Sequence, residues 1–278
     1  MVRPLGVKET SASCYSREYF LSEGDLRAFE RFKKGGRPGA VYFKALEHIP
    51  EDIEGPFLDI GCGRGEMVVH MARLGKRVYG IDYSPDAIRI CQEVLRSERK
   101  SVQTLAGFRL VDCTNFPFKN HTFQCLFLLD LVEHLTPRQL KLTLQEANRV
   151  LKSQGVLIIH TNNKYFEKIT KITIAAFYHG IKVFLRPKKA LEEESSSPYE
   201  YLHINYLTGG ELLRYLEEVG FKAKIEYVKP RKKTELEKFV AYPEGWKKSI
   251  YFNAAWLLLN SSLIKFISPT FWIIARKR

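Results

Sequence analysis

Residues 57–66 read Phe57-Leu58-Asp59-Ile60-Gly61-Cys62-Gly63-Arg64-Gly65-Glu66, and this stretch decides the fold. An apolar segment typical of a buried strand runs into three glycines at alternate positions, and a helical pattern follows at once. Glycine permits a positive φ and lets a ligand approach the backbone closely. The stretch therefore predicts a strand, a tight ligand-binding turn and a helix.

A second apolar strand ends in Asp82. A carboxylate about 20 residues after such a turn can accept both ribose hydroxyls of a nucleotide. A dinucleotide site would place a further glycine at position 66, where this chain has Glu66. An acidic side chain in the first helical turn repels a pyrophosphate and suits a cofactor that carries a cation. We therefore expect an adenosine-containing cofactor with positive charge, and a nicotinamide-dependent oxidoreductase is disfavoured.

Four landmarks follow one another in a fixed order. They are the glycine turn, Gly80-Ile81-Asp82-Tyr83-Ser84-Pro85-Asp86-Ala87-Ile88, Val111-Asp112-Cys113 and Leu129-Asp130-Leu131-Val132-Glu133-His134-Leu135. In this order they resemble the class I S-adenosylmethionine-dependent methyltransferases, of the small-molecule or glycan type and similar to methyltransferase type 11. The resemblance covers residues 56–161 well and the remainder more loosely. It implies S-adenosyl-L-methionine, which carries a sulfonium and an ammonium, as the cofactor.

The resemblance also implies roles for individual residues. Asp82 is expected to accept the ribose hydroxyls, and Tyr83 to lie against the adenine. Asp112 is expected to accept the adenine amine, while the backbone N–H of Cys113 serves the ring. The expected cofactor-binding residues are Asp59, Gly61, Gly63, Gly65, Asp82, Tyr83, Asp112, Cys113 and Leu129.

Asp130, Glu133 and His134 follow the fourth expected strand with spacings that share one face of a helix. Two carboxylates and an imidazole so placed are candidates for a divalent metal site. The pattern D-x-x-E-H is similar to the metal-holding E-x-x-E-H of the ubiquinone-pathway O-methyltransferases. Many methyltransferases end this strand with a similar V-x-E-H and bind no metal. The three residues are therefore metal candidates, and no metal is expected.

Methyl transfer needs a base only where the acceptor loses a proton. The candidates for that base are His134, His160, His203 and Tyr206. We expect His134 and His203 to be catalytic, since imidazole titrates near neutrality and similar enzymes have a histidine near position 203 that caps the active site. A structural role for either histidine remains an alternative.

Strands and helices alternate along the middle of the chain, which predicts a parallel sheet covered by helices on both faces. Strands are expected at 56–60, 77–81, 108–111, 123–129 and 155–161, and helices at 66–74, 85–98 and 137–151. The resemblance implies a Rossmann-like, seven-stranded, mostly parallel sheet whose last strand is antiparallel. Segments 221–228 and 270–276 suit strands six and seven.

The chain is expected to have three parts. Residues 1–50 form an N-terminal helical cap with two short helices, residues 51–163 form the cofactor-binding core, and residues 164–278 supply the remaining strands. The last part also contains two insertions, 164–198 and 229–268, which combine lysines with apolar and aromatic residues. They are expected to form a lid, to contact a second subunit, or to lie on an anionic membrane face.

The cysteine content and the net charge limit the compartments and binding partners that are expected. The five cysteines are odd in number and form no C-x-x-C pair, which indicates a reducing compartment and argues against a disulfide framework or a zinc site. No apolar leader is present at the start of the sequence, so a cytoplasmic location is expected, with peripheral contact at the inner membrane face as a hypothesis. The net charge of +13 suits either a solvated basic surface or an anionic partner.

The sequence thus predicts methyl transfer to a small-molecule, glycan or lipid-linked acceptor, most simply at oxygen. An RNA or protein methyltransferase that uses the basic surface is the alternative. The tetrapeptide N/D/S-P-P-Y/F, which positions amines in nucleic-acid methyltransferases, does not follow the fourth strand. A non-catalytic protein with a cofactor-like pocket is a further alternative. The acceptor and the oligomeric state stay open.

Overall fold

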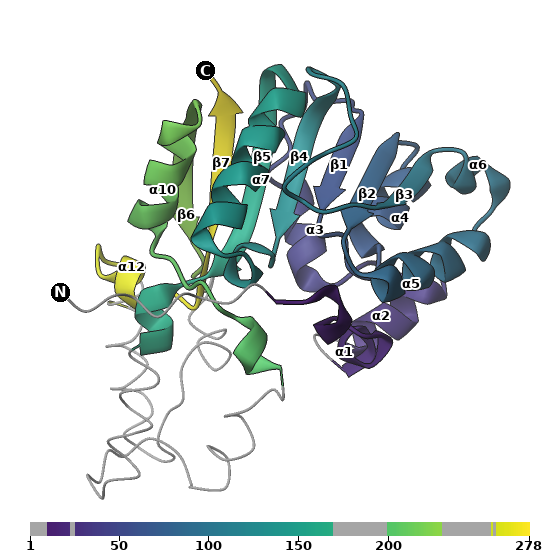
Figure 1. The fold of residues 1–278 in the computed structure, drawn as a ribbon, viewed down its shortest axis with the longest axis horizontal. Coiled ribbons are helices and arrows are strands. Elements are labelled where there is room, and N and C mark those ends of the chain that lie inside the picture. The colour runs from purple at the N-terminus through teal and green to yellow at the C-terminus, as the bar shows by residue number, and fades with distance from the viewer. Residues whose placement is uncertain (1–9, 23–25, 169–198, 230–256, 258–259) are drawn as a thin grey trace, which may run out of the picture.

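The computed structural model describes residues 10–22, 26–168, 199–229, 257 and 260–278. Its seven strands form one sheet in the order β3-β2-β1-β4-β5-β7-β6 (Figure 1). The strands are β1 Phe57–Ile60, β2 Val78–Asp82, β3 Ala106–Leu110, β4 Phe123–Leu129, β5 Leu151–Asn162, β6 Phe221–Tyr227 and β7 Thr270–Lys277. β1 to β5 run parallel, and β7 is antiparallel to both β5 and β6. The predicted Rossmann-like sheet is confirmed.

Helices cover both faces of the sheet, as a series of parallel strands requires. The helices are α1 Arg17–Ser22, α2 Leu26–Lys33, α3 Ala40–Leu46, α4 Glu66–Arg73, α5 Pro85–Arg96, α6 Lys100–Gln103, α7 Pro137–Val150, α10 Gly209–Glu218 and α12 Ile264–Ile267. Residues of α7 and α10 share one apolar cluster with the sheet, and residues of α3, α4 and α5 share the other. Successive residues of a strand point to opposite faces of the sheet, so a central strand such as β1 contributes side chains to both apolar clusters.

Local signals place the helices that follow the functional strands. Ser84 precedes α5, and its side chain accepts a hydrogen bond from the backbone of Ala87. Thr136 begins α7 with a capping box that Gln139 completes. Such caps satisfy backbone N–H groups that the first helical turn leaves unpaired. The expected starts of both helices are confirmed.

β5 begins earlier than the sequence pattern predicts. It starts at Leu151, directly after α7, and not near Gly155. Leu151 pairs with Phe123 of β4, and the register then shifts before Cys125 pairs with Val156. An irregularity of this kind adds residues to one strand without ending it, so the strand is longer than the predicted range 155–161.

The prediction of two short helices in the N-terminal cap is wrong, because the described part of this segment forms α1, α2 and α3. The third helix follows the glycine break and buries Ala45 against the sheet. In Figure 1, α1 and α2 lie beside α5, at the end of the sheet toward which β1 and β4 point. The cap therefore stands over the carboxyl ends of the parallel strands, where ligands bind in folds of this kind.

The two lysine-rich insertions fall largely outside the described residues. Residues 169–198 and 230–256 belong to them, so the predictions for a lid or a membrane-binding surface stay predictions. Across the described ranges, no helix has the length and apolar character needed to cross a membrane.

Candidate active site

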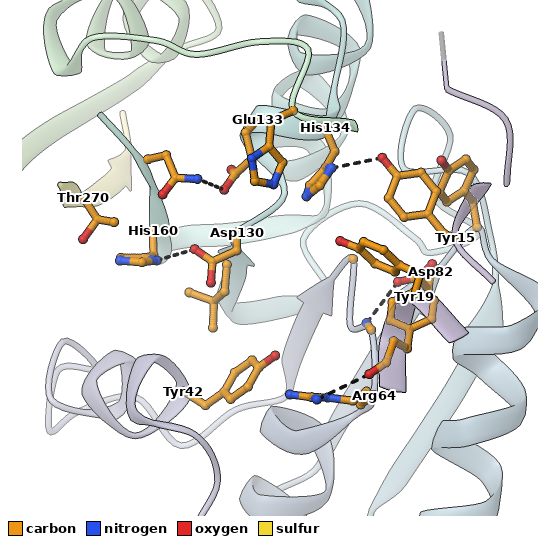
Figure 2. A pocket seen from close by; sticks show the side chains of 17 residues that line it. Tyr15, Tyr19, Tyr42, Arg64, Asp82, Asp130, Glu133, His134, His160 and Thr270 are labelled. Atoms are coloured by element: carbon orange, nitrogen blue, oxygen red, sulfur yellow. Dashed lines mark hydrogen bonds and ion pairs between the residues drawn. The ribbon is translucent and has the colours of Figure 1, made fainter. Parts of the chain in front are cut away.

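A cavity of about 430 Å³ opens at the carboxyl ends of the central strands (Figure 2). Small-molecule sites commonly have volumes of about 300–1,000 Å³. The lining residues are Tyr15, Tyr19, Phe20, Tyr42, Gly61, Gly63, Arg64, Asp82, Tyr83, Leu129, Asp130, Glu133, His134, His160, Asn162, His203 and Thr270. Of the predicted cofactor residues, this set includes Gly61, Gly63, Asp82, Tyr83 and Leu129.

The glycine turn requires glycine for reasons of both conformation and space. Its φ values are 73° at Gly61, 48° at Gly63 and 76° at Gly65, a region that other residues rarely adopt. A Cβ atom on Gly61 would lie 2.9 Å from the side chain of Leu131. A Cβ on Gly63 would meet only the ring of Phe20, at 3.6 Å, so Gly63 presents open backbone to the cavity.

Asp82 lies at the end of β2, next to the glycine turn. Its Oδ2 accepts the N–H of Gly63 at 3.0 Å, and its Oδ1 accepts the N–H of Ser84 at 2.9 Å. Burial raises the pKa of this carboxyl group to about 6. Tyr83 follows it, and the Tyr83 hydroxyl donates to the carbonyl of Thr10 at 3.4 Å. The carboxylate is thus fixed by two backbone donors, and each oxygen keeps capacity for a ligand hydroxyl.

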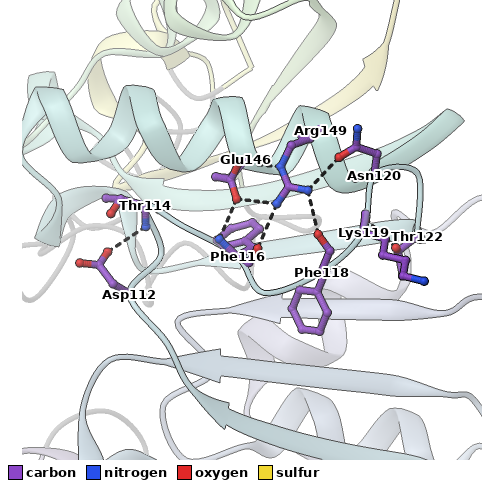
Figure 3. Close-up of polar contacts among 9 residues, drawn as sticks. All are labelled: Asp112, Thr114, Phe116, Phe118, Lys119, Asn120, Thr122, Glu146 and Arg149. Atoms are coloured by element: carbon purple, nitrogen blue, oxygen red, sulfur yellow. Dashed lines mark hydrogen bonds and ion pairs between the residues drawn. The ribbon is translucent and has the colours of Figure 1, made fainter.

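Four predicted cofactor residues lie outside the cavity lining. Asp59 is buried in β1, and burial raises its pKa to about 8. Gly65 is the last glycine of the turn, and a Cβ atom there would lie 2.9 Å from the side chains of Cys91 and Phe108. Asp112 is exposed, and its Oδ1 accepts the backbone N–H of Thr114 at 2.8 Å (Figure 3). Burial raises the pKa of the Cys113 thiol to about 12. Their proposed contacts with a cofactor therefore stay predictions.

Arg149 of α7 hydrogen-bonds to the segment that follows Asp112 (Figure 3). The Arg149 guanidinium donates to the carbonyls of Phe116 and Phe118 at 3.0 and 2.7 Å. It also pairs with Glu146, which accepts the backbone N–H of Phe116 at 2.7 Å. This network fixes the path of the chain between β3 and β4.

Glu66 does not act as the sequence suggested. It is 1% exposed and is absent from the cavity lining. Its carboxylate accepts the backbone N–H of Gly39 at 3.0 Å and pairs with Arg64 at 2.8 Å. The expected attraction between Glu66 and a cationic cofactor is therefore corrected, because tertiary contacts with the cap and with Arg64 occupy the carboxylate. The charged side chain that this turn offers to the cavity is Arg64.

The three metal candidates do not converge. The segment Val132–His134 is a 3₁₀-helix, so the α-helical spacing that would place Asp130, Glu133 and His134 on one face does not apply. Asp130 and Glu133 hydrogen-bond to neighbouring residues of β5, whereas His134 hydrogen-bonds to Tyr15 and Leu202. Within the described ranges, no group of three histidine, cysteine or acidic side chains is arranged to hold a metal ion.

Asp130 and His160 form a pair across two neighbouring strands. Asp130 has a φ of 52°, and its N–H donates to the carbonyl of His160. The Asp130 carboxylate accepts from Nδ1 of His160 at 2.5 Å. Burial alone would lower the pKa of His160, but the charge and hydrogen bond of Asp130 outweigh burial and raise it. The Asp130 side chain is 48% exposed and that of His160 only 6%, so the carboxylate is the more accessible member.

Glu133 holds the loop that precedes α10. Its carboxylate accepts from the Thr161 hydroxyl at 2.8 Å and from the Asn162 amide at 3.1 Å. Its backbone carbonyl accepts the N–H groups of Ile204 and Asn205. Burial, with a contribution from neighbouring carboxylate charge, raises the pKa of Glu133 to about 7. The residue therefore links β5 to the loop that carries His203.

His134 and His203, the predicted catalytic residues, both line the cavity. Nδ1 of His134 lies 3.0 Å from the Tyr15 hydroxyl and 3.2 Å from the Leu202 carbonyl. Because a carbonyl only accepts, this nitrogen carries the proton. Burial, and then the nearby His203, lower the pKa of His134 to about 4. His134 is thus a neutral imidazole at pH 7. The second predicted residue, His203, has its Nδ1 atom 3.1 Å from the Tyr206 hydroxyl.

Some lining residues were not assigned from the sequence. They are Tyr15, Tyr19, Phe20, Tyr42, Arg64, Asn162 and Thr270. The aromatic content of the cap was a usable signal for the first four. Nothing in the local sequence around Asn162 or Thr270 distinguishes them from ordinary strand-end residues.

Residues 58–159 match the family model described as a methyltransferase domain. A ubiquinone biosynthesis O-methyltransferase from Glaesserella parasuis is 28% identical over 186 residues, which span 59% of this chain and 76% of that protein. Residues 58–159 thus form a class I S-adenosylmethionine-dependent methyltransferase domain. The predicted cofactor, S-adenosylmethionine, is confirmed as the methyl donor of this domain.

Other similar proteins differ in their acceptor atoms. A norajmaline N-methyltransferase from Rauvolfia serpentina is 30% identical over 101 residues, 36% of this chain and 34% of that enzyme. A S-adenosylmethionine-dependent methyltransferase structure from Archaeoglobus fulgidus has a TM-score of 0.57 at 19% identity, covering 90% of this chain and 99% of that one. The structural likeness supports the fold of the methyltransferase domain, and it does not choose between oxygen and nitrogen acceptors.

Proposed function

We propose that this methyltransferase transfers the methyl group of S-adenosylmethionine to a hydroxyl oxygen of a small-molecule acceptor, with Asp130 and His160 accepting the hydroxyl proton. The observation that carries the proposal is the hydrogen-bonded Asp130–His160 pair in the cavity lining. The O-methyltransferase relative from ubiquinone biosynthesis is consistent with an oxygen acceptor.

The proposed cofactor side of the cavity is the glycine turn together with the end of β2. Gly63 offers open backbone there, and Asp82 offers two carboxylate oxygens next to it. Asp82 would accept the ribose hydroxyls, Tyr83 would lie against the adenine, and Leu129 would contact the methionine portion. The bound cofactor supplies an electrophilic methyl group on a sulfonium. The protein has to align the acceptor with that group and exclude water.

In the proposed reaction, the Asp130–His160 pair takes up one proton. The carboxylate holds the Nδ1–H of His160, which leaves the lone pair on Nε2 and favours the imidazolium once the proton has arrived. His134 is a weaker choice, because burial holds its pKa at about 4 and its Nδ1 is engaged by the Leu202 carbonyl. We therefore assign His134 and His203 to acceptor contact.

The charges of the lining favour an acceptor whose reacting end is not an anion. Among the described lining residues, Arg64 is the one lysine or arginine, and it belongs to the glycine turn. The opposite side carries the carboxylates of Asp130 and Glu133. A phosphate or carboxylate next to the reacting hydroxyl would be repelled there.

The test is a methyl-transfer assay on matched pairs of small acceptors. Phenol, catechol and glycerol are each compared with the analogue in which an amine replaces the hydroxyl, and the S-adenosylhomocysteine formed is measured. We expect turnover of a hydroxyl compound, a rate that rises with pH through the titration of His160, and a loss of about 10²–10⁴-fold in His160→Gln. Transfer to amines alone, or full activity in His160→Gln, would overturn the proposal.

A further inference from the structure

One row of side chains crosses the sheet from the cavity to the far edge. Leu129 of β4 pairs in register with His160 of β5, His160 pairs with Trp272 of β7, and Trp272 pairs with Glu226 of β6. Residues paired in this way point to the same face of a sheet. The cross-sheet row (Leu129, His160, Trp272 and Glu226) therefore connects an edge strand to the Asp130–His160 pair.

Within this row the Trp272 indole contacts two imidazoles. Its ring centroid lies 4.5 Å from that of His160, with 41° between the planes. It lies 4.8 Å from that of His48, with 44° between the planes. His48 follows α3, so the second imidazole comes from the cap side of the molecule. Trp272 thus contacts His160 on one side and His48 on another.

The surroundings leave His160 little freedom. Trp272 is 2% exposed, and it packs in the apolar cluster shared by α3, α4 and α5. His160 is itself buried, with Nδ1 held by Asp130. A closely packed interior resists rotation of a ring that it encloses. The orientation of the imidazole is thus set by one hydrogen bond and one aromatic face.

We propose that Trp272 is a positioning residue for methyl transfer, which keeps the His160 imidazole in the plane that its hydrogen bond to Asp130 requires, with His48 supporting the indole from the other side. This inference rests on the proposed role of His160 as proton acceptor. Trp272 is not in the cavity lining, so it acts through His160 and not on the acceptor.

His48 supports the indole as a neutral ring. Its Nδ1 lies 4.0 Å from the Glu226 carboxylate. Burial lowers the pKa of His48, Glu226 and Glu47 act to raise it, and Lys44 and His160 act to lower it further. Because the net shift is downward, His48 is uncharged at neutral pH. It therefore does not repel the proton that His160 gains during turnover.

The experiment compares Trp272→Leu, Trp272→Phe and His48→Gln in the full chain. The first readout is the pH profile of kcat with catechol, or with whichever hydroxyl compound of the matched panel is turned over. The second is the NMR signal of the His160 Nδ1–H in the free protein. Phe271→Leu is the matched control, because Phe271 is a buried aromatic residue of the same strand that contacts Tyr227 on the opposite face.

We expect Trp272→Leu to lower kcat about tenfold to a hundredfold, as small misplacements of a reacting group do, with little change in the KM for S-adenosylmethionine. The acid limb of the pH profile of kcat moves to lower pH in this variant, because a His160 ring that is held less firmly loses the hydrogen bond to Asp130 that raises the His160 pKa. Trp272→Phe keeps an aromatic face and most of the rate. His48→Gln gives a smaller shift in the same direction, and Phe271→Leu lowers Tm without moving the limb.

An acid limb and an Nδ1–H signal in Trp272→Leu that match the unmodified protein would overturn the inference. The proposed function fails separately, when His160→Gln keeps full activity. In that case the Nδ1–H signal still reports whether Trp272 holds the ring. A signal that is lost in Trp272→Leu and kept in Phe271→Leu supports positioning.

Discussion

The hydroxyl of Tyr15 lies 3.0 Å from Nδ1 of His134, although 119 residues separate them in the chain. Tyr15 belongs to the N-terminal cap, and His134 follows β4. The Tyr15 backbone is held as well, because its carbonyl accepts from the Ser84 hydroxyl at 2.7 Å. The cap is therefore fixed on both sides of the cavity, by α5 and by the segment after β4.

Tyr15→Phe is expected to weaken the binding of S-adenosylmethionine about three- to tenfold, because one hydrogen bond of about 1 kcal/mol no longer holds the cap over the cavity. The ring contacts of Tyr15 with Tyr19 and Tyr83 are kept in this variant. Isothermal titration calorimetry measures the change. Tyr201→Phe, at an exposed position, should bind as the unmodified protein does, and equal affinities for both variants would contradict the prediction.

Affinity for S-adenosylmethionine is expected to fall as pH decreases through about 6, the pKa to which burial raises Asp82. In the proposed site the ribose hydroxyls donate to both oxygens of the ionised carboxylate, and protonation turns one of these oxygens from an acceptor into a donor. Asp82→Asn should weaken binding by about 1–3 kcal/mol at pH 8 and should flatten the pH dependence. The measurement is the Kd for S-adenosylmethionine between pH 5 and 8 in both proteins. The prediction is refuted by a Kd that depends on pH in Asp82→Asn as it does in the unmodified protein.

Glu133 is expected to make the protein less stable as pH rises. Burial raises its pKa from 4.5 to about 7, so between these values the folded state binds more protons than the unfolded state. The free energy of unfolding therefore falls as pH increases across that window and levels off above it. Urea titrations at several pH values should show this slope reduced in Glu133→Gln, and an identical slope in both proteins would argue against it.

Arg149→Met is expected to destabilise the fold by about 2–3 kcal/mol, because two backbone carbonyls and Glu146 lose their shared donor. The loss should be local at first, with faster hydrogen exchange in residues 113–118. Arg138→Met, at an exposed position of the same helix, is the matched control and should change stability little. Comparable losses in the two variants would show that the network contributes nothing specific.

EDTA is expected to leave methyl transfer unchanged. Asp130, Glu133 and His134 hydrogen-bond to separate partners, so they are not arranged around a common point. Rates measured before and after chelation test this directly. Activity that is lost with EDTA and restored by Mg²⁺ or Zn²⁺ would restore these residues as metal ligands.

The fold could be predicted because its signals are local. The glycine turn, the carboxylate at Asp82 and the cap at Ser84 each depend on a few adjacent residues. The alternation of strands and helices then leaves few topologies. The early start of β5 escaped prediction because it depends on a register irregularity opposite Phe123, which no local pattern of polar residues reveals.

The site was less predictable because its chemistry depends on partners distant in sequence. His160 was one of four candidate bases, but its pairing with Asp130 follows from the register of β4 and β5. The charge of Glu66 was read correctly, whereas its partners Gly39 and Arg64 could not be known before the cap was placed. A side chain's type is local information, and its availability to a ligand is not.

The order of strands at one edge of the sheet has a consequence during translation. β6 occupies the edge and pairs with β7, which lies between it and β5 but is made after it. A nascent chain that has emerged only as far as β6 has no neighbour ready to receive that strand. Thr270, which lines the cavity, and Trp272, whose ring contacts His160, both belong to β7. They are therefore synthesised after the residues of the glycine turn. Chains halted before β7 would contain the glycine turn, Asp130 and His160, but would lack Thr270 in the cavity lining and the indole that packs against His160.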